Sequence, residues 1–360
     1  MTVSEQFPPC PPGLVYVSDD MPGIARRRRG RGFGYADALG QAVTGSARDR
    51  IERLGIPPAW ENVWICADPA GHLQATGFDA AGRKQYRYHP DWSAWRSRAK
   101  YGSLADFGAA LARFRARVER DLRGEVGDLD FSLAAIAVLL DRLHLRVGSA
   151  AYTARNGTFG ATTLLRRHLK LGDGALELRY RAKGGKLVEH TLRDRRLHRT
   201  FEAIDDLPGR QLFTWIGADG EVHTIGSHHV NAYLAERAGV EGVSAKTFRT
   251  WAGTMAGFRA ALQAKGKLGI RTLSEAAAAA LHNTPAIARS SYIHPAVLDL
   301  AAVPAEERRT LLVALRPAGP LRLQADERRL LRLLREHTPP PATGPELESA
   351  LRNSLARATG

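Results

Sequence analysis

Five features of this sequence have residue types that suit chemistry at a phosphate group, although they lie far apart along the chain. Arg146, Lys183 and Arg249 carry positive charge, Asn283 can donate a neutral hydrogen bond, and Tyr292 has a hydroxyl group. Guanidinium groups stay charged at neutral pH and match phosphate oxygens, and a tyrosine hydroxyl can form a covalent intermediate. Taken singly, none of the five residues identifies a reaction.

Each feature also has an ordinary structural explanation. Arg146 follows an apolar helical stretch, where an arginine can interact with the helix dipole. Lys183 is expected in a turn, and a turn lysine is usually solvated. Lys246 and Arg249 are three residues apart and can form a solvated basic face of one helix. Tyr292 can be a core or surface aromatic residue. Only the whole set is therefore informative.

The elements that would position these residues are mostly helical from Leu104 onward. Apolar residues recur at helical spacing through residues 104–118, and residues 131–144 form a second, strongly apolar helix. Residues 176–192 alternate instead, with Lys183-Gly184-Gly185-Lys186 at their centre, which predicts a hairpin with Lys183 at its exposed tip. Helical periodicity resumes in residues 195–204, 227–238, 246–262, 272–281 and 307–336.

Two helix starts lie next to the candidate residues. Ser244 is a suitable N-cap for the helix that carries Lys246 and Arg249 on one face. Thr284, with Pro285 at the first helical position, predicts the start of the helix that leads to the tyrosine. An alanine-rich helix comes directly before this second start.

The N-terminal part predicts a small β-rich domain. Strand-like runs cover Asn62 to Ala67, Leu73 to Phe78, and Gln85 to Tyr88, separated by turns. Tyr86 and Tyr88 then share one face of the third strand, with Gln85 and Arg87 on the other. Residues 91–103 show no clear periodicity, so we expect the domain boundary there.

The predicted fold class is α+β, with a small β-rich N-terminal domain in residues 1–98. A mostly helical domain with a small β-hairpin sheet follows in residues 99–360. Its core spans approximately residues 104–305 and its helical extension residues 306–360. The segment 338–344 breaks the helical pattern, and a last amphipathic helix follows it.

A run of arginines, Arg26-Arg27-Arg28-Arg29-Gly30-Arg31, follows a proline-rich start. It can be a flexible solvated loop or a loop that grips phosphates, and the sequence leaves both interpretations open. Within the proline-rich start, Leu14, Val15 and Val17 can add one edge strand.

Composition sets wider limits. The 360 residues carry a net charge of +15, for which a polyanionic partner is the simplest reason, although a GC-rich genome also favours arginine. Cys10 and Cys66 are the only cysteines, so neither a disulfide framework nor a cysteine zinc site is expected. No apolar run has membrane-spanning length and the start lacks a signal pattern. We therefore expect a soluble cytoplasmic protein, at the nucleoid, without membrane contact.

In order and spacing the candidate residues resemble the poxvirus-like type IB DNA topoisomerases, including their bacterial members. The ordered set consists of Arg146, Lys183, Lys246-x-x-Arg249, Asn283-Thr284-Pro285 and Tyr292. The stretch Gly82 to Tyr88 also resembles the DNA-contacting strand of that family. The resemblance covers the chain roughly from residue 50 to residue 300. It implies that residues 1–98 form a DNA-clamping domain and that residues 99–360 form a catalytic domain of the tyrosine recombinase and topoisomerase IB kind. It also implies ATP-independent relaxation of supercoiled double-stranded DNA, by a monomer, through transient single-strand cleavage and religation with a 3′-phosphotyrosine intermediate.

The resemblance also implies roles for single residues. Tyr292 would be the nucleophile, Arg146 and Arg249 would bind the scissile phosphate, and Lys183 would protonate the leaving 5′ oxygen. Asn283 falls where viral and eukaryotic members usually have a histidine, and it can donate a hydrogen bond but cannot carry charge. The neighbouring His282 is the alternative. Further DNA contacts are implied for Gln85, Tyr86, Tyr88, Tyr152 and Lys246.

This chemistry explains why no cofactor is expected. Two guanidinium groups can stabilise the charge that builds on the phosphate, and no acidic or histidine cluster has metal-ligand spacing, so no obligatory metal is predicted. A phosphotyrosine bond retains the energy of the broken phosphodiester, and the sequence has no phosphate-binding loop of the ATPase kind, so no ATP is predicted.

Two other functions remain open at this point. A tyrosine recombinase would share the fold, both arginines, the lysine hairpin and the tyrosine, and the ending Tyr292-Ile293-His294 resembles that family. Lys246 where recombinases usually have a histidine, together with the β-rich N-terminal part, favours the topoisomerase. In a non-catalytic DNA-binding protein, Tyr292 would be structural.

Overall fold

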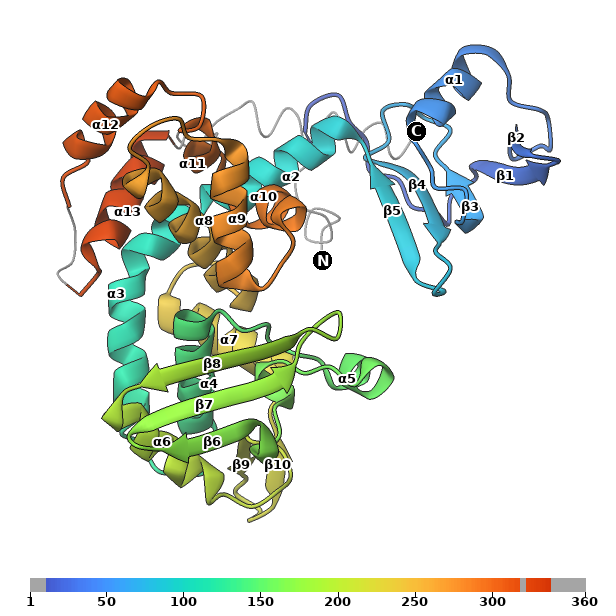
Figure 1. The fold of residues 1–360 in the computed structure, drawn as a ribbon. Helices are drawn as coiled ribbons and strands as arrows, with labels where there is room; N and C mark the ends of the chain where they lie inside the picture. Colours follow the sequence, from blue (N-terminus) through green and yellow to red (C-terminus); the bar gives the residue numbers. More distant parts are fainter. Residues whose placement is uncertain (1–10, 318–321, 338–360) are drawn as a thin grey trace. The chain divides into compact units, whose positions relative to one another are not determined.

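The computed structural model describes residues 11–317 and 322–337 and divides into two compact units (Figure 1). The first unit contains residues up to Gly102, and the second begins at Ser103. All five residues proposed above for chemistry belong to the second unit. The structure of this unit alone therefore shows whether their side chains lie close together.

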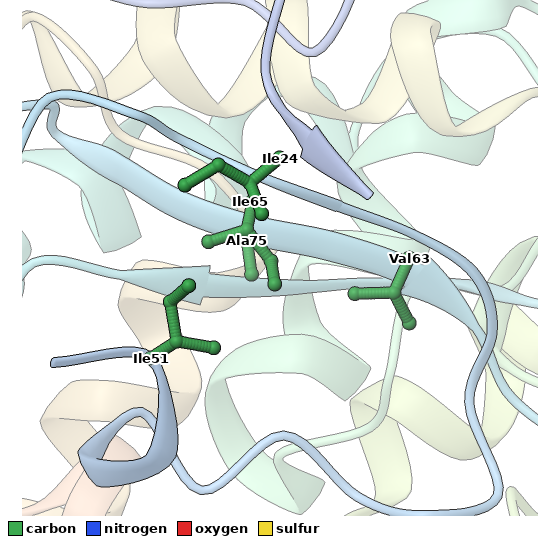
Figure 2. Packing of buried hydrophobic residues seen from close by; sticks show 5 residues of the cluster. All are labelled: Ile24, Ile51, Val63, Ile65 and Ala75. Carbon is green, nitrogen blue, oxygen red and sulfur yellow. The ribbon is translucent and has the colours of Figure 1, made fainter. Parts of the chain in front are cut away.

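The first unit is built on a five-stranded antiparallel sheet with strand order β2-β1-β3-β4-β5. Its strands are β1 (Ile24–Arg29), β2 (Gly32–Ala36), β3 (Glu61–Ile65), β4 (Leu73–Phe78) and β5 (Lys84–Tyr88). The three strands predicted from sequence are confirmed. One face of the sheet packs on helix α1 (Gly45–Arg53), and Figure 2 shows the core between them, made by Ile24, Ile51, Val63, Ile65 and Ala75.

The arginine run was expected to be a loop, and this expectation is wrong. It forms strand β1 and the turn of the β1–β2 hairpin, with Arg28 opposite Phe33. Arg26 explains part of the stability of this hairpin. Its half-buried guanidinium donates to the carbonyl groups of Pro57 (3.1 Å) and Trp60, and lies 4.1 Å from the ring centroid of Phe33.

The segments on either side of the sheet also differ from expectation. The edge strand around Val15 is reduced to a single bridge to Gly71. The stretch after β5 that lacked periodicity is helix α2 (Pro90–Gly102). Trp92 and Trp95 lie on one side of it and stack at 5.2 Å between centroids, so two large rings replace the usual stripe of aliphatic residues.

The second unit is mainly helical, as predicted, and its core is formed by apolar helix faces. The five stripe residues of α3, namely Leu104, Phe107, Leu111, Phe114 and Val118, are all buried. Its longer helices are α3 (Leu104–Asp121), α4 (Leu129–Leu143), α6 (Arg195–Asp205), α7 (Ser227–Ala238), α8 (Ala245–Gln263) and α9 (Ile270–Leu281). Shorter helices are α5 (Ala150–Asn156), α10 (Pro285–Tyr292) and α11 (Pro295–Asp299), and α12 (Ala305–Ala314) and α13 (Ala325–His337) end the described chain.

Two small sheets complete this unit. The predicted hairpin is confirmed as β7 (Ala175–Arg181) and β8 (Leu187–Arg193), and β6 (Leu169–Gly172) adds a third strand that the sequence did not predict. A two-stranded sheet of β9 (Thr214–Ile216) and β10 (Val222–Thr224) was also not predicted, because three-residue strands are too short to show a period.

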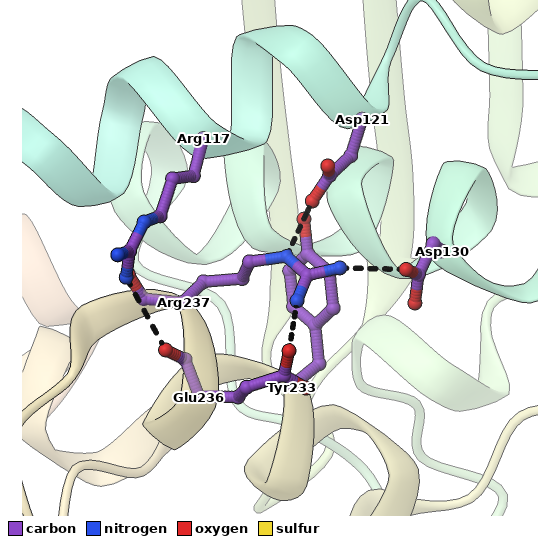
Figure 3. Close-up of polar contacts among 6 residues, drawn as sticks. All are labelled: Arg117, Asp121, Asp130, Tyr233, Glu236 and Arg237. Atoms are coloured by element: carbon purple, nitrogen blue, oxygen red, sulfur yellow. Dashed lines mark hydrogen bonds and ion pairs between the residues drawn. The ribbon is translucent and has the colours of Figure 1, made fainter.

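Helices α3 and α7 are joined by a polar cluster around Arg237 (Figure 3). The Arg237 guanidinium lies 2.6 Å from both Asp121 and Asp130, and the Tyr233 hydroxyl donates to Asp121 at 2.7 Å. Because Arg237 and Asp121 are largely shielded from solvent, this cluster fixes the packing of α7 more firmly than a surface ion pair would.

None of the helices in the described residues is long and apolar enough to cross a membrane. The last helix expected from the sequence, after residue 344, lies outside the described residues, as does the break at residues 338–344.

Candidate active site

Arg249 is the buried centre of the site. It lies in the second turn of α8, where Thr247 accepts a hydrogen bond from the Ser244 backbone (3.1 Å) and closes the helix start. The arginine is only 5% exposed, and its guanidinium donates to the carbonyl groups of His144 and of Leu281 (3.0 Å). The alternative explanation of a solvated basic face shared with Lys246 is therefore excluded for Arg249, which is buried, whereas Lys246 in the first turn is exposed.

The charge on Arg249 has an unusual environment. Burial lowers the pKa of its guanidinium, the nearby charge of Arg146 lowers it further, and Tyr292 opposes both effects. An arginine nevertheless stays protonated at physiological pH. The site therefore contains a permanent positive charge that no carboxylate of the described residues pairs with, which suits the binding of an anion.

Arg146 lies close enough to Arg249 for its charge to lower the pKa of that guanidinium. Helix α4 ends at Leu143, because His144 adopts a left-handed conformation (φ 56°). Arg146 therefore lies beyond the helix end, which argues against the ordinary explanation that it interacts with the helix dipole. Its carbonyl accepts from the Ala161 backbone at 2.8 Å, and a side chain at Gly160 would lie 2.6 Å from that carbonyl oxygen. With its backbone held in this way, the Arg146 side chain donates to the Asn283 amide oxygen.

Asn283 is positioned by a tight helix end. The left-handed residue His282 (φ 51°) terminates α9, and the Asn283 backbone donates to Ala278 at 3.0 Å. The side-chain oxygen of Asn283 is occupied by Arg146, whereas its Nδ2 is buried with no hydrogen-bond partner in the described part of the chain. A buried donor without a partner is costly, so it is expected to find one in the bound state.

Tyr292 is the last residue of α10 and is held against α8. Helix α10 starts as predicted, with Thr284 capping Ile287 and proline in the first turn. At its other end, the Thr254 hydroxyl donates to the Tyr292 carbonyl (3.2 Å), and Gly253 leaves room for that backbone, since a Cβ there would lie 2.7 Å from the carbonyl oxygen. The ring centroid of Tyr292 is consequently 5.2 Å from the Arg249 guanidinium carbon.

Lys183 lies at the tip of the β7–β8 hairpin, where it was predicted. The turn is closed by backbone bonds between Ala182 and Lys186 (2.8 Å) and between Gly185 and Ala182 (2.9 Å). Lys183 is exposed, and within the described residues it has no hydrogen-bond or ion-pair partner. The structure therefore brings together Arg146, Arg249, Asn283 and Tyr292, and leaves Lys183 on a separate, exposed turn.

Sequence reasoning missed the buried groups beneath the site. Tyr180 on β7 is 4% exposed, and burial raises the pKa of its phenol to about 12, against the opposing effect of Arg146 and Arg249. His190 on β8 packs edge-on against His282, with 5.2 Å between ring centroids. Burial, aided by His282 and His144, lowers the pKa of His190 to about 4. Only the alternation of β7 and β8 would have predicted that Tyr180 and His190 point inward.

The further DNA contacts expected from sequence lie on exposed surfaces. Tyr152 on α5 is 41% exposed. On β5 of the first unit, Tyr86 and Tyr88 stack at 6.0 Å on one face, and the Gln85 amide donates to Asp79 at 2.9 Å. The structure does not test their roles.

The described residues contain no group of three or more histidine, cysteine or acidic side chains arranged to hold a metal ion.

The site and the fold agree with the comparisons to known proteins. A family model of the eukaryotic DNA topoisomerase I catalytic core matches residues 90–288, more than half of the chain. The chain belongs to the type IB DNA topoisomerase family. The N-terminal domain model of bacterial DNA topoisomerase IB matches residues 32–79. A curated relative, DNA topoisomerase 1B of Acanthamoeba polyphaga mimivirus, is 28% identical over 295 residues, which cover 78% of this chain and 88% of the viral protein.

As a type IB topoisomerase, the protein is an isomerase that acts on DNA and relaxes supercoils, and the comparisons give no support to the recombinase alternative. The match to the catalytic core ends at residue 288, four residues before Tyr292. The assignment of the nucleophile therefore depends on the geometry around that tyrosine.

Proposed function

We propose that Tyr292 cleaves one DNA strand at a phosphodiester held by Arg146, Arg249 and Asn283, with Lys183 as the general acid. The observation that carries this proposal is that the two arginines each contact one of the other two residues. Arg249 lies beside the ring of Tyr292, and Arg146 is hydrogen-bonded to Asn283. These four side chains come from separate parts of the sequence, and neither arginine pairs with a carboxylate of the described residues.

The reaction follows from the charges. The Tyr292 hydroxyl loses its proton to water in the positive field of the two arginines, and its oxygen attacks phosphorus. The bond from phosphorus to the 5′ oxygen breaks, and the released 5′ oxygen takes a proton from Lys183. Charge grows on the two non-bridging oxygens, which two guanidinium groups can neutralise. Religation is the reverse reaction, in which the 5′ hydroxyl attacks the 3′-phosphotyrosine. Torsion in the DNA drives strand rotation between the two steps.

Asn283 fits the role of a neutral hydrogen-bond donor better than His282 does. Its oxygen is taken by Arg146, so its buried Nδ2 is left to donate to a phosphate oxygen. The His282 ring instead packs against His190, and burial together with Lys186, Arg249 and Arg146 lowers the pKa of its imidazole. A neutral imidazole turned toward another ring supplies no charge to the phosphate.

Lys183 fits the role of general acid because of its position. The leaving 5′ oxygen is strongly basic and requires a proton, which an ammonium group can deliver. Two glycines with positive φ, Gly184 (82°) and Gly185 (74°), form the turn that carries Lys183. An exposed turn of this kind can move toward the DNA once the duplex is bound.

We further propose that the enzyme needs neither ATP nor a divalent ion and acts as a monomer on duplex DNA in the nucleoid. The phosphotyrosine bond keeps the energy needed for religation, and the arginines supply the positive charge that a metal would otherwise provide. The exposed residues Tyr86, Tyr88, Tyr152 and Lys246, with Gln85, are proposed as DNA contacts. The net charge of +15 supports extensive phosphate contacts.

The test is the variant Tyr292→Phe, assayed on any supercoiled plasmid without paired recognition sites. We expect plasmid relaxation to be lost while the dissociation constant for duplex DNA changes little, because only the nucleophilic oxygen is removed. The neighbouring variant Ser290→Ala, on the exposed side of α10, serves as the control and should relax DNA normally. Relaxation by Tyr292→Phe would disprove the assignment.

A further inference from the structure

The β1–β2 hairpin has one face made almost only of arginine and glycine. The register pairs Arg27 with Gly34 and Arg29 with Gly32, so each arginine lies opposite a residue without a side chain. Arg27, Arg29 and the turn residue Arg31 are exposed and pair with no carboxylate in the described part of the chain. This face is therefore flat, cationic and open.

The glycines are not required by the backbone. Neither Gly32 nor Gly34 has a positive φ, so a strand-forming residue would fit their conformation. A Cβ at Gly34 would meet only the Arg29 side chain, at 3.1 Å from Cδ, and a Cβ at Gly32 would meet nothing closer than 3.9 Å. Glycine in a strand often marks a bulge, a bend or the close approach of a ligand or another backbone, and the β1–β2 register contains no bulge.

The register also shows which side of the sheet this face belongs to. Ile24 pairs with Ile65 on the core side, so Ala25 and, by alternation, Arg27 and Arg29 lie on the opposite side. We call this opposite side the outer face. Following the pairs Ala25–Trp64, Trp64–Thr76 and Thr76–Tyr86 across the sheet places Tyr86 on the same outer face.

The outer face is open at its two edges and covered in its middle. The Trp64 indole donates to the Met21 carbonyl (2.9 Å), and the Thr76 hydroxyl donates to Asp19 (2.8 Å). Asp19 also pairs with Lys84 at 2.6 Å. What remains exposed is the arginine–glycine hairpin at one edge and Tyr86, 47% exposed, at the other.

We propose that the arginine–glycine face of the β1–β2 hairpin binds the phosphate backbone of duplex DNA, as a second contact on the sheet face that carries Tyr86. The flat glycine surface lets a DNA strand approach the sheet, while Arg27, Arg29 and Arg31 reach its phosphates. Such contacts add affinity and position the duplex without reading its sequence. This inference rests on the family's DNA substrate and on no assignment of catalytic residues.

The experiment compares two hairpin variants of the full-length protein by fluorescence anisotropy on a short duplex of mixed sequence. Arg27→Gln/Arg29→Gln/Arg31→Gln should lower the slope of log K against log salt concentration by about 2 to 3, because each lost phosphate contact removes about 0.9. Gly32→Thr/Gly34→Val keeps every charge and should still weaken binding about tenfold, because it blocks the approach of the DNA strand.

The matched control is Arg48→Gln/Arg53→Gln, which removes exposed charge from α1 on the core side of the same sheet. It should change affinity by less than the hairpin variants do. The inference is overturned if the control weakens binding as much as the triple variant, if the triple variant binds normally, or if the glycine variant binds normally. Circular dichroism and the thermal unfolding midpoint confirm that each variant is folded, so the binding result does not depend on which residue is the nucleophile.

Discussion

Arg249 and Lys183 are both proposed to act on the same phosphate, yet their surroundings are opposite. Arg249 is buried on a long helix and hydrogen-bonded to two backbone carbonyls, whereas Lys183 is exposed on a glycine turn without a partner among the described residues. Groups that stabilise developing charge work best when they are fixed beforehand. A proton donor needs only to be within reach of the leaving oxygen when the bond breaks. We therefore distinguish Arg249, which is held rigidly, from Lys183, which is proposed to reach its position only when DNA is bound.

The largest effect is expected at the rigid part. Arg249→Lys keeps the charge but replaces the planar guanidinium, whose two terminal nitrogens reach the carbonyls of His144 and Leu281, with one nitrogen that lacks this fork geometry. The single-turnover cleavage rate should therefore fall about a hundredfold or more. Religation should fall by a similar factor, since both directions share one transition state. A variant that slows only one direction would contradict the fixed role of Arg249.

Lys183→Ala should also slow cleavage, by about a hundredfold, which is typical of a general acid. The comparison is sharpened by a substrate in which sulfur replaces the leaving 5′ oxygen. A thiolate needs no proton to leave, because a thiol has a pKa of about 8.5. This substrate should restore the rate of Lys183→Ala and leave Arg249→Lys slow. If the sulfur substrate restores the rate of both variants, or of neither, the proposed difference between Lys183 as proton donor and Arg249 as stabiliser of phosphate charge is wrong.

A smaller effect is expected at Asn283. Asn283→Ala removes one neutral donor and should reduce the cleavage rate about tenfold, whereas His282→Ala should have less effect on the rate constant. Single-turnover cleavage of both variants gives the comparison directly. If His282→Ala is the slower enzyme, the two neighbouring residues have been assigned the wrong way round.

The smallest effect concerns the histidine beneath the site. Burial holds the pKa of His190 at about 4, below its unfolded value of 6.5, so the folded state disfavours the charged imidazole. The stability that follows from this is present above pH 6.5 and is lost as the pH falls from 6.5 toward 4. When the pH falls from 7 to 5, the Tm of the wild type should therefore decrease by about 2–4 °C more than the Tm of His190→Gln does. The variant His228→Gln, at an exposed histidine, should follow the wild type.

The sequence predicted most of the long elements, because their signal is periodic. The spacing of neighbouring residues was enough to predict helix α3, the apolar helix α4 and the β7–β8 hairpin. Helix α2 was missed because its apolar surface consists of Trp92 and Trp95 rather than a regular stripe. The arginine run was predicted as a loop because charge suggested solvation, whereas the cross-strand pairing that makes it a hairpin is not local.

The same limit applies to the site. Sequence order led to the proposal of Arg146, Lys183, Arg249, Asn283 and Tyr292 as site residues. It did not show that four of them are held together while Lys183 is exposed on a turn. The hydrogen bond between Arg146 and Asn283 joins residues 137 positions apart. Gly253, which makes room for the Tyr292 backbone, has no sequence signal of its own.

The most direct test of the central claim uses a duplex in which the strand beyond the cleavage site is lost after cutting, so the covalent intermediate accumulates. Proteolysis and mass spectrometry then locate the DNA adduct. The account predicts a single adduct, at Tyr292, with the phosphate on the 3′ end of the DNA. An adduct at any other residue, or a trapped 5′ phosphate, would contradict it.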